Sequence, residues 1–277
     1  MNRKKIIVTG ANGSIGKEIV RQLIEKDCDI IMACRNIDKA INVKNEIINT
    51  QKCQSERIEI IKFDASSFYS IKQFASEIKN KKIKVDGLIN NAGGTNRNFS
   101  LNDRNIETTI MTNYISAFAL SKLITPLMNE NSNIVNVISI LSNIRCLKKN
   151  IFNNNQKKYS QLGAYADSKV ALAVFTSSLS ELLGNKIRVN AADPGIVDTG
   201  IIKLNRWFDP LADKFFRPLI KTPKKGAIPI VNAVLSSKTE YAFRGKKCKP
   251  MKKKFKQHKL KSWLWDETEK IVKRNLV

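Results

Sequence analysis

The sequence predicts an α/β fold built on one doubly wound parallel sheet. Short apolar runs typical of buried parallel strands alternate along the chain with longer amphipathic segments typical of helices. No internal repeat and no Gly/Ser-rich linker interrupts this alternation over the 277 residues, which favours a single domain. Parallel strands joined by helices need right-handed crossovers, so helices are expected on both faces of the sheet.

The expected strands are short runs of mostly aliphatic residues that end at polar residues or glycine. They lie at 5–8, 30–34, 58–63, 85–90, 133–138 and 187–191. The helices between them are expected at 14–26, 37–50, 67–80, 103–129 and 163–183. The first helix shows the spacing of one helical face at Ile15, Ile19, Val20, Leu23 and Ile24. This order of elements predicts a doubly wound sheet.

Two segments depart from the regular pattern. Residues 143–160 form a polar insertion rich in Asn and Lys. Residues 200–222 hold Trp and Phe among prolines, which predicts either a lid over a substrate pocket or a helix packed on the core. We therefore expect one domain over 1–277, with a nucleotide-binding and catalytic core at 5–200, the lid segment at 200–222 and a basic C-terminal extension at 223–277.

The chain is strongly basic, with 49 Lys and Arg against 24 Asp and Glu and a net charge of +25. Such a balance favours contact with polyanions, or reflects only lysines on solvated faces. The second interpretation is preferred, because charge governs association rather than fold. Nucleic acid is therefore not an expected partner.

The positive charge is densest between Arg244 and Lys261, where no carboxylate occurs. Phe255, Trp263 and Trp265 lie within or just after this run. Cations with interleaved aromatics favour weak contact with an anionic membrane, where Trp sits at the headgroups. The preferred alternative is that the Trp and Leu side chains pack on the sheet edge and the lysines point to water.

The five cysteines are odd in number and scattered, with no CxxC pair and no metal-ligand cluster. This usage predicts free thiols, no metal site and a reduced cytoplasmic protein. No apolar run approaches the ~18 residues that a membrane span needs.

A glycine-rich turn follows the first expected strand. Glycines between a strand and a helix let the backbone approach a pyrophosphate, and the helix N-terminus supplies free N–H groups and positive dipole. The residues of this turn are Gly10, Asn12, Gly13, Ser14, Ile15 and Gly16. Their position after a buried strand predicts a Rossmann-type dinucleotide site.

The end of the second strand predicts which dinucleotide is bound. An acidic residue there would bind both ribose hydroxyls and repel a 2′-phosphate, but this chain has Arg35. A guanidinium suits a phosphate dianion, so NADP is favoured over NAD. Asp64, at the end of the third strand, could accept from the adenine amino group, cap the following helix, or do both.

Tyr165 and Lys169 lie four residues apart at the start of an expected helix and so share one helical face. An ammonium beside a phenol stabilises the phenolate, so we expect the pKa of Tyr165 to fall towards working pH. Ser139 ends the preceding buried strand, where substrates bind in open α/β sheets. The three residues predict acid–base chemistry.

Together these features resemble the short-chain dehydrogenase/reductase family, and within it the retinol dehydrogenase-like branch. The matching segments run in the family's order over most of residues 5–200, and the stretch from Thr222 to Glu269 is similar to the C-terminus of the branch. The segments are Thr9-Gly10 with Gly16, residues 33–36, Phe63-Asp64, residues 90–93, Asn113, residues 134–139, Tyr165 with Lys169, and Pro194-Gly195 with Thr199.

The resemblance implies a role for each matching residue. Ser139 would hydrogen-bond the substrate oxygen and Tyr165 would be the acid/base. Lys169 would tune Tyr165 and hold the nicotinamide ribose, and Asn113 would position a water in the proton relay. Further residues would support the cofactor in the turn after the fourth strand and in the nicotinamide-side loop: Asn90, Ala92, Gly93, Pro194, Gly195 and Thr199.

The activity implied by the resemblance is NADP-dependent transfer of a hydride between nicotinamide and a small-molecule carbonyl or alcohol, with a hydrophobic aldehyde, ketone or alcohol as substrate. A homo-oligomer is compatible with the sequence. Two alternatives are a soluble 3-oxoacyl carrier reductase and a non-catalytic nucleotide-binding protein. The long insertion between Ser139 and Tyr165 argues against the first, and the intact catalytic set argues against the second.

Two residues depart from the family pattern. Ser14 stands where the middle glycine is usual, with Gly13 one position earlier, so a Cβ is expected near the pyrophosphate. Ile138 stands where a second serine often precedes the catalytic one, and this change is expected to be neutral.

Overall fold

The computed structural model describes residues 3–197 and 220–276. Its sheet has eight strands in the order β3-β2-β1-β4-β5-β6-β7-β8. All neighbouring pairs are parallel except β7 and β8, which form an antiparallel hairpin at one edge. The strand bounds are β1 Lys5–Thr9, β2 Asp29–Cys34, β3 Ile58–Lys62, β4 Val85–Asn90, β5 Met128–Val137, β6 Ile187–Asp193, β7 Tyr241–Arg244 and β8 Lys247–Pro250.

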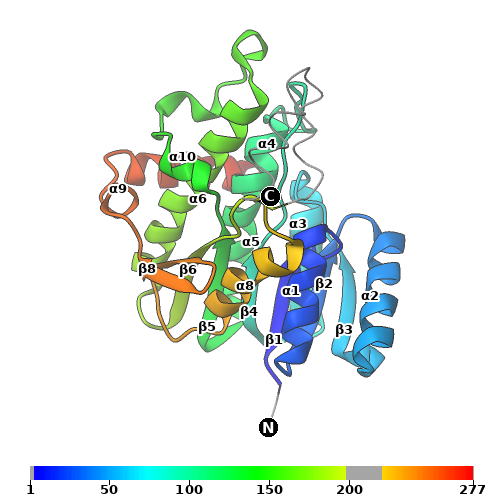
Figure 1. Cartoon of the computed structure of the whole chain (residues 1–277). Coiled ribbons are helices and arrows are strands. Elements are labelled where there is room, and N and C mark those ends of the chain that lie inside the picture. Colours follow the sequence, from blue (N-terminus) through cyan, green and yellow to red (C-terminus); the bar gives the residue numbers. More distant parts are fainter. Residues whose placement is uncertain (1–2, 198–219, 277) are drawn as a thin grey trace.

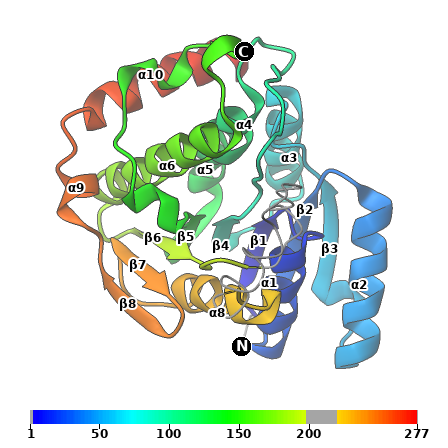
Figure 2. The same cartoon turned by 45° about the horizontal axis from the view of Figure 1, so that its top comes forward.

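Helices cover both faces of this sheet, which confirms the predicted doubly wound fold (Figures 1 and 2). Their bounds are α1 Ser14–Glu25, α2 Ile37–Gln51, α3 Phe68–Asn80, α4 Thr108–Ile110, α5 Ser116–Ile124, α6 Gln161–Leu183, α8 Pro223–Val234, α9 Lys253–Lys256 and α10 Lys261–Leu276. One apolar core lies between the sheet and α1, α2 and α8. The other lies between the sheet and α3, α5, α6 and α10.

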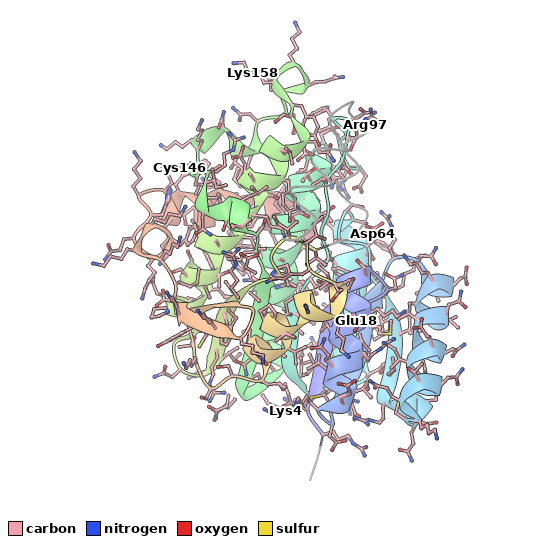
Figure 3. All side chains as sticks on the ribbon, viewed as in Figure 1. Lys4, Glu18, Asp64, Arg97, Cys146 and Lys158 are labelled. Carbon is pink, nitrogen blue, oxygen red and sulfur yellow. The ribbon has the colours of Figure 1, made fainter. Side chains whose placement is uncertain are left out.

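The order of the strands reverses between β1 and β4, which lie side by side although the chain runs from β1 outwards to β3 before returning. Ligands of open α/β sheets bind beyond the carboxyl ends of the strands at such a reversal. Lys4 precedes β1 and Asp64 follows β3, and Figure 3 shows these two labelled side chains at opposite ends of the strands. The candidate site residues lie at the carboxyl ends of the strands, the end at which Asp64 lies.

The helix expected at 103–129 is shorter and is not continuous. It begins at Thr108, because the Glu107 carboxylate accepts hydrogen bonds from the N–H groups of Thr109 and Ile110, both at 2.8 Å. A π-helical turn at Met111–Ile115 separates α4 from α5. The helix ends at Ile124, before a 3-10 turn that contains Pro126. Proline has no N–H to continue a helical ladder, so the chain leaves the helix and β5 starts at Met128.

The C-terminal residues from 220 onwards are part of the same domain. The β7–β8 hairpin extends the sheet beyond β6, and α10 packs on α5 and α6. The Trp265 ring lies 5.0 Å from that of Phe118 and 5.9 Å from that of Phe175. The tryptophan therefore packs inward, as preferred from the sequence, but on helices rather than on the sheet edge.

The segments that depart from the regular pattern differ in what the structure shows of them. The insertion at 143–160 contains short 3-10 turns, and its Phe152 ring stacks near Tyr114 and Trp263. Most of the predicted lid lies outside the described residues. Within the described ranges, no helix combines the length and apolarity that crossing a membrane requires.

Candidate active site

A side chain of β1 holds together the two loops at the centre of the site. The Thr9 hydroxyl donates to the Ile89 carbonyl at 3.2 Å and accepts from the N–H groups of Asn91 and Ala92 at 2.9 and 2.8 Å. The turn after β4 therefore lies directly against Gly10. A Cβ at Gly10 would lie 3.1 Å from the Ala92 Cα, and the φ of +63° there also requires glycine.

The glycine turn has the geometry of a pyrophosphate site. Gly16 lies so close to the preceding loop that a Cβ would be 2.2 Å from the Gly10 carbonyl oxygen. Gly13 is the N-cap of α1, and the first turn of this helix carries no acidic side chain. As at any helix start, its first N–H groups have no partner within the helix, so they are available to an anion.

The substitution of serine for the middle glycine is accommodated by this geometry. Ser14 is the first residue of α1 and is exposed, so its side chain is not packed against the loop. Gly13 has a φ of −78°, an ordinary value for any residue. The Asn12 side chain donates to the Asn36 carbonyl at 3.0 Å and so connects the glycine turn to the loop after β2.

Arg35 and Asp64 follow β2 and β3 at the carboxyl edge. Arg35 is exposed and forms no ion pair with any described residue. The Asp64 carboxylate accepts from the Ser66 N–H at 2.9 Å and the Ser66 hydroxyl at 2.7 Å. Helix α3 is capped by Ser67 instead. The capping role considered for Asp64 is therefore wrong, and the adenine contact stays a prediction.

Lys169 is buried on α6, and its ammonium group donates to the Val137 carbonyl at 2.6 Å. Burial lowers the pKa of Lys169 to about 8, and the nearby Asp193 carboxylate partly opposes this shift. Lys169 Nζ lies 5.6 Å from the centre of the Tyr165 ring. The two residues thus share one face of α6, as predicted.

The pKa of Tyr165 moves in the direction opposite to the one expected. Burial of the phenol raises this pKa, the hydrogen bond with Ser139 opposes the rise, and the Asp193 charge adds to it. The expectation that the pKa of Tyr165 falls is therefore wrong for this arrangement, because burial of the phenol is the largest influence on this pKa. Ser139 nevertheless lies close enough to the Tyr165 phenol to act on its pKa, and Lys169 contacts Val137 two residues before Ser139, so the three residues converge at the end of β5.

Asn113 joins this group from the π-helical turn. Its side-chain oxygen accepts from the Gly94 N–H at 2.8 Å, and its amide donates to the Gly94 carbonyl and the Ser168 hydroxyl, both at 2.9 Å. A Cβ at Gly93 would lie 2.7 Å from the Asn113 oxygen and 3.6 Å from Lys169 Nζ. Turns of this kind are frequent at functional sites.

Asn90 is buried beneath the turn at 91–93 and supports the site through hydrogen bonds within the core. Its buried amide donates to the Asn136 side-chain oxygen at 2.8 Å and to the Ser121 hydroxyl at 3.1 Å. Asn136 in turn donates to the Thr176 hydroxyl at 3.0 Å. This chain of hydrogen bonds fixes β4 and β5 against α5 and α6, and so positions the turn at 91–93.

The loop after β6 begins at Pro194, and Gly195 has a φ of +81°. Asp193, which the sequence analysis did not single out, accepts from the Gly195 N–H at 2.9 Å. It acts on the pKa values of both Tyr165 and Lys169. A carboxylate directly before Pro-Gly at a strand end is the signal that could have revealed it. Thr199 lies outside the described residues.

The residues present fit a dinucleotide cofactor, because a glycine turn leads directly into the start of α1 and the first turn of this helix carries no acidic side chain that would repel a pyrophosphate. A doubly wound sheet with Ser139, Tyr165 and Lys169 at its carboxyl edge defines an oxidoreductase of the Rossmann type. The short chain dehydrogenase family model matches residues 4–207. The chain belongs to the short-chain dehydrogenase/reductase family.

Its relatives include enzymes of the retinol dehydrogenase-like branch. The chain is 30% identical to the polyprenol dehydrogenase of Homo sapiens over 276 residues, which cover 95% of this chain and 83% of the relative. It is 27% identical to retinol dehydrogenase 13 of Mus musculus, over 97% of this chain and 84% of the relative. The branch predicted from the sequence is confirmed.

Solved structures show the same fold. An uncharacterised protein from Mycobacterium paratuberculosis matches with a TM-score of 0.78 at 24% identity, over 98% of this chain and 93% of that one. The NADPH-dependent 3-quinuclidinone reductase from Rhodotorula rubra matches with a TM-score of 0.69 at 19% identity, over 88% and 90% of the two chains.

Proposed function

We propose that this protein is an NADP-dependent oxidoreductase that interconverts an alcohol and a carbonyl compound, with Tyr165 as the acid/base. The observation that carries the proposal is the convergence of Ser139, Tyr165 and Lys169 beside Gly93 and Asn113. Bound nicotinamide would supply or accept the hydride. The protein would contribute alignment and a proton.

Each catalytic side chain has a task that follows from its surroundings. The Ser139 hydroxyl lies near the Tyr165 phenol, so a substrate oxygen placed between them would meet two donors. In the direction of reduction, the Tyr165 O–H gives its proton to that oxygen as the hydride reaches the carbon. With a pKa of about 8, Lys169 is charged at neutral pH and offsets the negative charge that the phenol gains.

Arg35 supports the preference for NADP. It follows β2 directly, at the position that faces the adenine ribose in this fold, and none of the described carboxylates pairs with it. A free guanidinium there would bind a 2′-phosphate through charge-assisted hydrogen bonds. NADP is therefore favoured over NAD.

The relatives support a hydrophobic substrate. The names polyprenol dehydrogenase and retinol dehydrogenase describe enzymes for long apolar alcohols. We propose the same class of substrate, an apolar alcohol or its aldehyde or ketone, for this chain.

A substrate screen tests this function. The purified protein would be mixed with NADPH or NADH and a panel of aldehydes from propanal to long prenyl aldehydes, and nicotinamide absorbance would be followed. We expect oxidation of NADPH that is faster than that of NADH and that improves with chain length. Binding of NADPH without turnover of any aldehyde, or of any alcohol with NADP, would show a nucleotide-binding protein instead.

A further inference from the structure

A cavity of about 340 Å³ lies next to the proposed catalytic residues, and its cationic and apolar side chains have no role in the proposed chemistry. It lies where the β7–β8 hairpin, the segment leading into α9 and the ends of β5 and β6 meet. Its apolar lining includes Ala242, Met251 and Phe255, and its rim carries Arg244, Lys247, Lys249 and Lys252. An apolar floor and a basic rim thus occur in one hollow.

The register of the hairpin explains why these cations gather. Arg244 pairs with Lys247 across the two strands, and Ala242 pairs with Lys249. Directly opposed residues of an antiparallel pair, and residues two apart on one strand, point to the same face. Arg244, Lys247 and Lys249 therefore lie on the face that also carries Ala242, with Ala242 packed against the core and the three cations exposed.

This arrangement places like charges against each other. Like charges directly opposed across a strand pair are destabilising. Arg244 has a partner in Asp193, whose carboxylate lies 3.7 Å from its Nε. The three lysines of the rim, all exposed, form no ion pair with any residue in the described ranges. Their charge is left for an external anion, and the apolar floor is left for a hydrocarbon.

The cavity adjoins the catalytic residues through two of its walls. Ile138 lines it and directly precedes Ser139. Asp193 also lines it, and the charge of this carboxylate acts on the pKa values of both Tyr165 and Lys169. A ligand in the cavity would therefore contact Ile138, the residue directly before the proposed catalytic serine.

We propose that this cavity binds an amphipathic anion, with a phosphate on the lysines of the rim and a hydrocarbon chain against Ala242, Met251 and Phe255. The lysines need an anionic group on the ligand, and the apolar lining needs a hydrocarbon chain. A bare anion would lack the apolar contact, and a neutral alcohol would leave the lysines without a partner. The lysines and apolar residues that would bind this ligand have no role in the proposed hydride transfer, so the proposal does not depend on that function.

Titration calorimetry without cofactor tests the proposal, with octyl phosphate as the probe and with methyl phosphate and octanol as its two halves. We expect octyl phosphate to bind at least tenfold more tightly than either half, since about six buried CH₂ groups each add to the affinity. Equal affinity for octyl and methyl phosphate would contradict the role of the apolar floor. Equal affinity for octyl phosphate and octanol would contradict the role of the lysines.

A pair of matched variants separates the cavity from the general positive charge. Lys247→Gln with Lys249→Gln removes two cations from the rim, whereas Lys246→Gln with Lys253→Gln removes two exposed cations that do not line it. We expect the first pair to weaken octyl phosphate binding about tenfold or more, because charge-assisted contacts are lost. The second pair should change it less than threefold.

The outcome for each variant is decisive. Equal weakening by both pairs would show attraction to the net charge alone and overturn the assignment. All four lysines are exposed, so both variants are expected to unfold at the wild-type temperature. NADPH oxidation with a short neutral aldehyde, measured separately, should be the same in both variants, so failure of the binding test and failure of the proposed function give different results.

Discussion

The ammonium group of Lys169 donates a hydrogen bond to the backbone carbonyl of Val137, with Nζ and O 2.6 Å apart. This bond fixes α6 to the last residue of β5, two residues before Ser139. The lysine proposed for catalysis is therefore held by the strand that leads to the proposed catalytic serine. The bond also stabilises the charged form of this buried amine, which burial disfavours.

Replacing Tyr165 by Phe should abolish turnover and leave cofactor binding nearly intact. The ring remains and only the transferable proton is lost, and general acid–base catalysis contributes about 10²–10⁴-fold or more. Steady-state kinetics and NADPH fluorescence titration measure the two effects. A kcat within threefold of wild type would remove Tyr165 from the mechanism.

Replacing Gly93 by Ala should disrupt the site, because the new Cβ would lie 2.7 Å from the Asn113 oxygen. Overpacking of this kind costs about 1–3 kcal/mol, and here the strain falls on Asn113 and on the turn that we expect to support the cofactor. Gly94→Ala is the matched control, since nothing lies within 4 Å of its Cβ. We expect kcat/KM for NADPH to fall at least tenfold only in the Gly93 variant. Equal kinetics for the two variants would argue against the close approach.

Arg35 should set the choice of cofactor. Arg35→Ala removes a charge-assisted partner of the 2′-phosphate, and such a hydrogen bond is worth roughly 1.5–3 kcal/mol. The Kd for NADPH should rise about tenfold or more, while that for NADH stays within twofold. Arg97→Ala changes the same charge elsewhere and serves as the control. The assignment fails if both cofactors weaken equally.

Lys169 should make stability rise with pH. Its pKa is about 8 in the folded protein against an ordinary 10.5, so between these values the unfolded chain binds a proton that the folded chain has released. Stability increases with pH wherever the unfolded state binds more protons. The free energy of unfolding of wild type relative to Lys169→Met should therefore rise by up to about 3 kcal/mol from pH 8 to 10.5. Urea titrations across this range measure it, and a constant difference would contradict the low pKa.

Asp193→Asn should move the pH–activity profile to lower pH. The Asp193 charge raises the pKa of both Lys169 and Tyr165, so its removal lowers both. Asparagine keeps an oxygen that can accept from the Gly195 N–H. The measurement is kcat/KM from pH 5 to 10, with the exposed Asp38→Asn as the control. A profile identical to wild type would show that Asp193 acts only in the loop.

The central strands were predictable because they are buried on both faces and read as continuous apolar runs. The β7–β8 hairpin was not, because Lys247–Pro250 is an edge strand with only partial burial and looks like a solvated basic run. The residues of the π-helical turn before α5 show no pattern that would have predicted the break in the helix. The pairing of Tyr165 with Lys169 followed from their spacing on one helix, whereas the pKa of Tyr165 depends on packing around the ring that no local pattern encodes.

The hydrogen bond between the Tyr114 hydroxyl and Thr268 spans 154 positions of the chain. Tyr114 lies at the centre of the core under α5 and α6, and during synthesis it leaves the ribosome long before its partner. Until α10 has been synthesised and packs on them, the side chains of Phe118 and Phe175 lack their contact with Trp265, so the growing chain exposes an apolar surface that can associate with other chains. The strands from β1 to β6 precede α10 in the chain and can pair before it, but the apolar face around Phe118 and Phe175 is covered only when α10 packs against it.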